Sequence, residues 1–530
     1  MILATCSPQT ASRYSGHESQ VTPPPRQGSS GHVTSDEVVS LPDVETSPSI
    51  AGLTGAYALG GAVSALVSVA SAAFFTRVLD AAAFGRASIA LSVQAGLAGI
   101  GTAWLQQAIL RYLPSAKDAR LALKLKQTSI VAAVFAFVGI LVTGLLAATL
   151  LRGSLGLQWR PLLLPAALAT ASTAFLGAIL AILQALFLAR EHAVARIVGA
   201  LLRFSLGVAL VLFFRMGEAA LVWALAISNA AVLCWLWSIA GFSTAVSGTV
   251  KWADCFLHIK KFAAYGVPLA VWYVAAQLLY AADRYIIQFA RGSAEVGLYT
   301  ASYDLVAGSV QLLSGPLLLA VHPYLIRTLA DISSEEIGAR LSRVLRWASL
   351  FGALASGFVW IFGERVVRRI VGPDFGAGAS IVPLVFLGVF IWNLGFYVHK
   401  PLELAERSGV LLALGLAAAV VNVALNIALV PSYGYRVAAV TTLVAYAVYL
   451  GLVLAYLHSR MMIRVEFGES IVTFCAIGVA CFCVGRGMEA LAGRAGEVLG
   501  LAAGAMSFGV VAWFGYQLAR RWRRREVSRG

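Results

Sequence analysis

Long apolar stretches separated by short polar connections dominate this chain from residue 53 onward. Each stretch is about 20 residues long, the length of an α-helix that crosses the hydrocarbon core of a bilayer. The pattern predicts fourteen membrane-spanning helices, at residues 53–76, 87–110, 128–151, 162–188, 193–214, 219–240, 263–290, 297–325, 344–363, 379–398, 409–429, 435–457, 470–487 and 497–518. Because this number is even, we expect both ends of the array on the same side of the membrane.

Composition supports a polytopic membrane protein. Only 12% of the 530 residues are charged and 59% are hydrophobic, with a mean hydropathy of +0.82. Soluble domains carry about 25% charged residues. The helical runs are rich in Ala, Leu, Val and Gly, residues that allow helices to pack closely in lipid. The sequence therefore predicts an all-α fold.

The runs divide the chain into five expected segments. Residues 1–50 are rich in Ser, Pro, Gly and Thr, which predicts a disordered cytoplasmic tail. Residues 51–245 are expected to form an N-terminal bundle with spans one to six and a connection, and residues 246–457 the core of a second bundle with spans seven to twelve. Residues 458–518 hold the last two spans, and residues 519–530 form a basic cytoplasmic tail.

The net charge of +15 lies mainly in the connections and the C-terminal tail. With the N-terminus inside, the inner connections carry roughly twice as many Lys and Arg residues as the outer ones, which follows the positive-inside rule. We therefore expect a multi-pass protein of the cytoplasmic (inner) membrane with both termini cytoplasmic. This distribution favours contact with membrane lipids and argues against a nucleic-acid partner.

A weak internal repeat relates the two parts of the array. Aligning residues 84–114 with residues 296–326, an offset of 212, gives seven identical positions in 31, among them Gly85 with Gly297 and Tyr112 with Tyr324. Both segments follow the first span of a seven-span half. Two pseudo-symmetric seven-helix bundles around a central cavity are a transporter architecture, with the substrate site between the halves.

Three motifs occur at defined positions in the predicted array. The first is RVLDAAAFG at residues 77–85, after the first span. The second is DRYII at residues 283–287 followed by VGLY at residues 296–299. The third is VNVALNIALVPSYG at residues 421–434 followed by two alanines at residues 438–439.

Together these motifs resemble the polysaccharide (O-antigen-type) flippases of the multidrug/oligosaccharidyl-lipid/polysaccharide (MOP) exporter superfamily. The resemblance covers about residues 51–518. The chain departs from the family pattern at Asp80, where the family has Gly, and at Arg436, where a small residue is usual. The resemblance implies a flippase that moves undecaprenyl-pyrophosphate-linked oligosaccharide units across the cytoplasmic membrane by alternating access, for lipopolysaccharide or exopolysaccharide biosynthesis. A polysaccharide polymerase and a chain-length regulator would be natural partners.

Arginines are the expected contacts of a pyrophosphate, because the planar guanidinium donates hydrogen bonds in pairs. Arg77 ends the first predicted span and Arg111 ends the second. Each is a candidate for substrate binding or gating. The alternative is that each extends to the lipid headgroups.

Ionised side chains within apolar runs are a second signal, since each costs roughly 2.5–3.5 kcal/mol at membrane depth on insertion scales. Asp283, Arg284 and Asp304 are such residues. Asp283 and Arg284 are adjacent and point about 100° apart on a helix, so they cannot simply pair with each other. A contact between Asp283 and Arg77 across the lumen is the sharpest structural hypothesis. Protonation of Asp283 in ion coupling and a structural salt bridge between helices are the alternatives.

Asn422 and Asn426 are four residues apart and share one helix face. Hydrogen bonds between helices are the expected role, with contact to sugar as the alternative.

The sequence has no motif of an enzyme, a cofactor site or a metal site. No Walker loop occurs, and the six cysteines show neither zinc-site nor disulfide spacing. A transporter is therefore expected. Two other functions remain open: a drug or cation antiporter of the same superfamily, and a membrane polysaccharide polymerase or ligase. Twelve spans and an acidic lumen would be usual for the first, and a long outer loop for the second.

Overall fold

The computed structural model describes residues 50–116, 118–154, 156–239, 252–310, 332–405 and 407–466, with a few positions between 468 and 475. Every regular element in these residues is a helix. This confirms the predicted all-α class.

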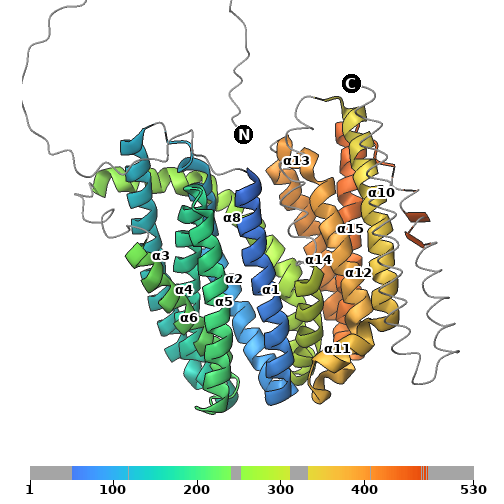
Figure 1. The fold of residues 1–530 in the computed structure, drawn as a ribbon. Coiled ribbons are helices and arrows are strands. Elements are labelled where there is room, and N and C mark those ends of the chain that lie inside the picture. The colour runs from blue at the N-terminus through green and yellow to red at the C-terminus, as the bar shows by residue number, and fades with distance from the viewer. Residues whose placement is uncertain are drawn as a thin grey trace, which may run out of the picture. The chain divides into compact units, whose positions relative to one another are not determined.

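Six long helices form what we call the first helix group (Figure 1). Their bounds are α1 (Ile50–Val78), α2 (Ala81–Tyr112), α3 (Ala119–Ser154), α4 (Arg160–Ala185), α5 (Ala189–Leu212) and α6 (Ala219–Ile239), with the short η2 (Leu157–Trp159) before α4. The second helix group contains α10 (Ser334–Phe358), η3 (Val359–Gly363), α11 (Glu364–Ile370), η4 (Pro373–Ile381), α12 (Val382–Val398), α13 (Lys400–Leu404), α14 (Ser408–Tyr433) and α15 (Tyr435–Met461). Between the groups runs α8 (Trp252–Arg291), followed by a further helical segment at residues 293–310.

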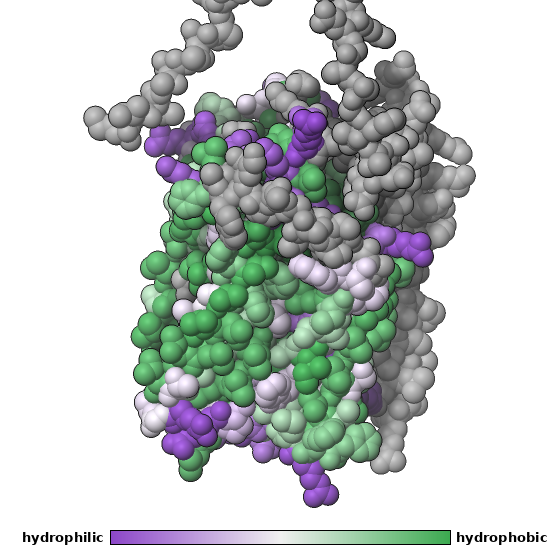
Figure 2. Space-filling model, turned by 90° about the vertical axis from the view of Figure 1, so that its left-hand side faces the viewer, coloured by the Kyte–Doolittle hydropathy of each residue, from purple (hydrophilic) through white to green (hydrophobic). Residues whose placement is uncertain are grey.

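Ten helices of the described residues are long and apolar enough to cross a membrane. They correspond to predicted spans one to six and nine to twelve. Span seven lies in α8, and span eight begins in segment 293–310. Spans thirteen and fourteen lie outside the described residues, apart from a few positions. Figure 2 shows a broad hydrophobic surface with hydrophilic residues above and below it, as a multi-pass membrane protein requires.

The 40-residue helix α8 contacts both groups. Its first part packs on the first group: Phe262 is fully buried and stacks on Tyr112 of α2, with ring centroids 5.7 Å apart. Its last part packs on the second group, where Leu279 joins a buried cluster with residues of α14 and α15. The helix also begins eleven residues before the predicted span, because its polar first turns lie beyond the apolar run.

One end of the assembly, called here the Asp80 end, is where α1 is connected to α2. Asp80 is the N-cap of α2, and its carboxylate accepts a hydrogen bond of 2.7 Å from the Ala83 amide. This satisfies one of the free amides at the helix start. The departure from the family glycine therefore has a local structural role.

The two helix groups meet at the Asp80 end. The Gly372 amide donates a hydrogen bond of 3.0 Å to Thr76 Oγ1 of α1. Phe84 of α2 packs edge-to-face on Phe375 of η4, with centroids 5.5 Å apart. These contacts close this end in the conformation that the structure describes.

Candidate functional site

The charged residues of the site lie on two consecutive helices joined by a tight turn. Arg284 is seven residues before the end of α8, and Asp304 is eleven residues into segment 293–310. Gly292 makes the turn with a φ of +88°, a conformation that residues with a side chain rarely adopt. At 1.5 Å per residue, Arg284 lies about 10 Å and Asp304 about 16 Å from the Asp80 end. Both therefore lie at membrane depth.

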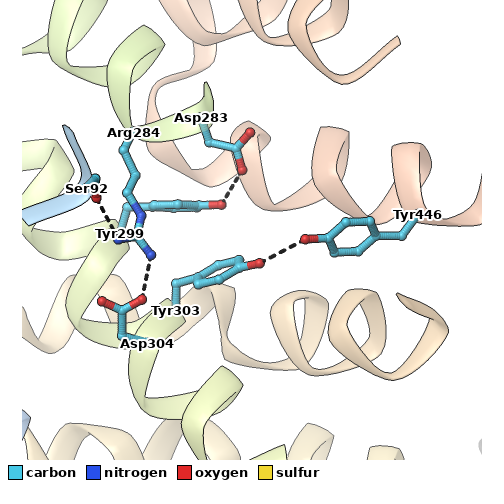
Figure 3. Close-up of polar contacts among 7 residues, drawn as sticks. All are labelled: Ser92, Asp283, Arg284, Tyr299, Tyr303, Asp304 and Tyr446. Atoms are coloured by element: carbon cyan, nitrogen blue, oxygen red, sulfur yellow. Dashed lines mark hydrogen bonds and ion pairs between the residues drawn. The ribbon is translucent and has the colours of Figure 1, made fainter. Parts of the chain in front are cut away.

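Arg284 bridges the two parts of the molecule (Figure 3). Its Nη2 pairs with Asp304 Oδ1 at 2.5 Å, and its Nη1 donates to Ser92 Oγ of α2 at 3.1 Å. The rings of Tyr280 and Tyr303 lie 5.2 and 5.8 Å from the guanidinium carbon. The guanidinium is thus held by ionic, hydrogen-bond and cation–π contacts.

The two residues that Arg284 joins are equivalent in the internal repeat. Ser92 and Asp304 are 212 residues apart, the offset that aligns the two halves. Each lies eleven residues after the start of its helix. The repeat therefore places a hydroxyl from one half and a carboxylate from the other on two nitrogens of one guanidinium.

Asp283 points away from Arg284 into the second helix group (Figure 3). Its side chain is buried and accepts hydrogen bonds from Tyr299 Oη at 2.6 Å and from Asn426 Nδ2 at 3.0 Å, and another from Thr442 Oγ1. All three donors are neutral. Among the described residues no salt bridge to Asp283 is found, so its direct partners are neutral hydrogen-bond donors.

Asn422 and Asn426 of α14 both face this group. Asn426 Oδ1 accepts from Thr441 of α15 at 2.8 Å, and Asn422 Nδ2 lies 3.4 Å from Thr442 Oγ1. Both side chains are fully buried. Asn422 Oδ1 has no hydrogen-bond partner among the described residues. The two asparagines thus link α14 to α8 and α15, and one amide oxygen of this buried network is left without a hydrogen-bond partner among the described residues.

Neutral aromatic residues border the charged site. Tyr303 Oη lies 3.2 Å from Tyr446 Oη of α15, and both side chains are buried. Tyr280, in contrast, is 43% exposed. The site therefore has a sealed side toward α15 and an open side at Tyr280.

Arg203 was not selected from the sequence, although it interrupts an apolar run. It is on α5, nine residues before the helix ends at Leu212, which places it about 14 Å from the Asp80 end. Its side chain is exposed at this depth. The signal that could have found it is the same one that selected Arg284: a lone arginine at membrane depth.

The predicted contact between Asp283 and Arg77 is wrong for this conformation. Arg77 is exposed at the end of α1 and donates hydrogen bonds to the main-chain carbonyls of Arg369, at 2.8 Å, and of Ile370. Asp283 lies eight residues before the end of its helix, about 12 Å deeper. The end of α1 therefore meets the second helix group, as the repeat predicts. The contact is with the main chain at Arg369 and Ile370 and not with the deeper Asp283.

Arg111 is at the other end of α2, away from the charged site. It is exposed, and its guanidinium carbon lies 4.9 Å from the ring centroid of Tyr265 on α8. The structure thus joins Arg284 to Asp304, and places Arg77 and Arg111 at opposite ends of the first group.

Comparison with known proteins agrees with this architecture. The lipid II flippase MurJ in an inward closed conformation superimposes with a TM-score of 0.66 at 13% identity, covering 87% of this chain and 98% of that one. A multidrug resistance MATE family transporter of the MOP superfamily, inward-facing, gives a TM-score of 0.55 at 16% identity over 77% of this chain and 94% of that one. The outward-facing form gives 0.54 at 14% identity, covering 78% and 95%. The fold is therefore that of MOP-superfamily transporters.

Sequence comparison identifies the family. No curated protein matches the sequence significantly. The family described as polysaccharide biosynthesis protein matches residues 53–329, just over half of the chain. This confirms the resemblance predicted from the three motifs, and the chain belongs to the polysaccharide biosynthesis protein family.

Proposed function

We propose that this protein is a flippase that moves undecaprenyl-pyrophosphate-linked oligosaccharide units across the cytoplasmic membrane by alternating access. The observation that carries the proposal is the ion pair of Arg284 and Asp304 at membrane depth, where Arg284 also contacts Ser92 of the first helix group. A diphosphate head group cannot cross hydrocarbon without compensating charge. Arginines within the helix assembly provide that compensation.

The comparisons support the substrate class. The chain belongs to a polysaccharide biosynthesis family, and the MurJ structure is named as a lipid II flippase. Polysaccharide units attached to a lipid carrier would combine these two features. The proposal extends to location: a cytoplasmic membrane protein with both termini cytoplasmic, two bundles divided near residue 246, and a polymerase and a chain-length regulator as partners.

Alternating access is supported by the arrangement of α8. This helix packs on the first group near Phe262 and on the second near Leu279. Opening the Asp80 end would separate Arg284 from Ser92 while leaving its pair with Asp304 within two consecutive helices. The described conformation then corresponds to a state closed at this end.

Reconstitution tests the proposed function. The full chain is placed in proteoliposomes with a fluorescently labelled undecaprenyl-diphosphate oligosaccharide, and a membrane-impermeant quencher reports the fraction in the outer leaflet. We expect faster exchange than in empty liposomes, slowed by Arg284→Gln but not by Arg152→Gln, which changes an exposed arginine at the end of α3. No exchange above that of empty liposomes would refute the proposal.

Ion coupling is assigned to Asp283. A buried carboxylate with only neutral partners is costly when ionised, so protonation or a bound monovalent cation would stabilise it. The Asn422 Oδ1 of the same buried network is a suitable additional oxygen ligand. Measuring transport by the wild-type protein, first with a proton gradient and then with a sodium gradient, identifies the coupled ion. Asp283→Asn is expected to lose the response to that gradient, and an unchanged response would exclude this role.

A drug or cation antiporter is the second candidate, because the MATE transporters share the fold. The charges argue against it: Arg284 and Arg203 lie at a similar depth to Asp304, and this excess of positive charge disfavours a cationic substrate. Drug susceptibility of a sensitised strain distinguishes the two functions, since a flippase should not raise resistance.

A further inference from the structure

Asp304 pairs with an arginine of the preceding helix, and a second arginine lies at a similar depth in the first helix group. Arg284 of α8 pairs with it directly at 2.5 Å. Arg203 of α5, in the first helix group, is exposed nine residues before the end of its helix. The three side chains together carry one positive charge, and they lie at a similar depth, about 10–16 Å from the Asp80 end.

The carboxylate is accessible, whereas its direct partner is not. The side chain of Asp304 is 45% exposed, and that of Arg284 is 6% exposed. The neighbours of Asp304 in sequence, Tyr303 and Leu305, are buried. An ionised carboxylate at this depth is stable only if its open side meets water or another polar group, so it faces a polar space and not lipid.

The guanidinium of Arg284 is held in place, and some of its N–H groups are not used in hydrogen bonds. Ser92 and Asp304 occupy one hydrogen bond each, and the rings of Tyr280 and Tyr303 fix the guanidinium. Its Nε is buried without a hydrogen-bond partner among the described residues. A planar group with several donors in fixed directions is suited to two oxygens of one phosphate, yet Asp304 uses only one donor.

We propose that Asp304 is a resident anion, which occupies the phosphate site of the empty transporter and is displaced from Arg284 by the diphosphate of the lipid-linked substrate. This inference rests on the proposed function and names the subsite where the head group binds. The exchange of one anion for another keeps Arg284 compensated at every stage. It also weakens substrate binding by competition, which permits release on the far side.

The repeat adds an independent argument. The position equivalent to Asp304 in the first half is Ser92, and Arg284 contacts both. A hydroxyl at one position and a carboxylate at the other gives the site a single resident anion. Exchanging the two residues, in Ser92→Asp with Asp304→Ser, would restore one anion beside the same guanidinium.

Binding of undecaprenyl diphosphate to the full-length protein in detergent tests the proposal, with undecaprenol as the uncharged control. Removing the competitor in Asp304→Asn should tighten diphosphate binding about tenfold, and Arg284→Gln should weaken it about tenfold or more. Asp304→Glu and the exchanged double variant should stay within about threefold of wild type. Binding of undecaprenol should not change in any variant.

Matched controls change exposed charges elsewhere: Asp374→Asn in η4 and Arg152→Gln in α3. Both should bind diphosphate as wild type does. If Asp304→Asn elutes as an aggregate, binding by Arg284→Gln and by the exchanged double variant still tests the proposal. Unchanged or weaker binding by a folded Asp304→Asn, or wild-type binding by Arg284→Gln, would overturn the proposal.

The proposed function can fail separately. Diphosphate binding with the expected variant pattern but no exchange in proteoliposomes would leave a diphosphate subsite in a protein that is not a flippase. Exchange in proteoliposomes with unchanged affinity in Asp304→Asn would leave the flippase without a resident anion.

Discussion

Gly85 and Gly297 pack reciprocally against the start of each other's helix. A Cβ atom at Gly85 would overlap the carbonyl oxygen of Ser293, and one at Gly297 would overlap that of Ala81. Both pairs obey the repeat offset, because 85 and 297, and 81 and 293, differ by 212. This is the arrangement of an isologous contact, in which the same surface occurs on both sides of a two-fold axis.

Alanine at Gly85 or Gly297 should therefore oppose closure of the Asp80 end. The added methyl group meets backbone that cannot move alone, at a cost of about 1–3 kcal/mol to the closed state. We expect a longer distance between spin labels at Leu157 and Tyr433, both exposed near this end, in a background without native cysteines. The rate of lipid exchange should fall as well.

The repeat supplies matched controls for this prediction. Gly96 and Gly308 are also 212 residues apart and helical, and a Cβ atom at either has open space. Gly96→Ala and Gly308→Ala should retain the wild-type label distance. An unchanged distance in both Gly85→Ala and Gly297→Ala would show that the close approach does not control closure.

Arg284→Lys should fail even though it keeps the positive charge. Lysine cannot reach Ser92 and Asp304 in the fixed directions of a guanidinium, and charged hydrogen bonds contribute about 1.5–3 kcal/mol each. We expect lipid exchange to slow at least tenfold, while the melting temperature changes by only a few degrees. Wild-type exchange by this variant would mean that charge alone is sufficient.

The Asp283 network should show energetic coupling between helices α8 and α14. Asn426→Ala removes one donor to a buried carboxyl group and should lower the free energy of unfolding by about 1–3 kcal/mol. Combined with Asp283→Asn, the loss should be smaller than the sum of the single losses by about 1 kcal/mol. A denaturing-detergent titration of the wild type, the two single variants and the double variant measures this difference. Simple additivity would argue against a direct contribution of the pair.

Asp80→Ala should lower the free energy of unfolding by about 1 kcal/mol, because it removes the N-cap of α2. Asp80→Asn keeps an oxygen that accepts from Ala83 and should retain stability. Asp80→Gly, the residue of the family pattern, should lose only a few tenths of a kcal/mol. Thermal unfolding ranks the three variants. Equal destabilisation by Asn and Ala would point to the charge and not to the cap.

The spans of both helix groups could be predicted from hydrophobic run length, since backbone groups in lipid must be paired within a helix. The ends could not. Helix α10 begins at Ser334, ten residues before the predicted span, because Ser333 caps it and accepts from the Glu336 amide at 3.2 Å. Capped polar turns extend beyond the bilayer, and a hydrophobicity pattern does not detect them.

The sequence also selected Asp283, Arg284 and Asp304 from the cost of charge at membrane depth, but it could not pair them. Which residues meet depends on how far each lies from its helix end and on the axis that relates the halves. Arg284 was found, but not its contact with Ser92, whose hydroxyl carries no signal in an Ala-rich helix. The partner assigned to Asp283 was wrong for the same reason.

The path of α8 limits how the chain can be divided. Cutting the chain between residues 239 and 252 would separate the two sequence repeats. It would also remove Phe262 and Tyr265 from the surface of α2 and α3 on which they pack. The first fragment alone would then expose an apolar patch inside the membrane, where a foreign helix could bind. Two fragments divided after Arg291 should assemble more readily than two divided at the repeat boundary. The halves of this protein, although similar, are no longer independent modules.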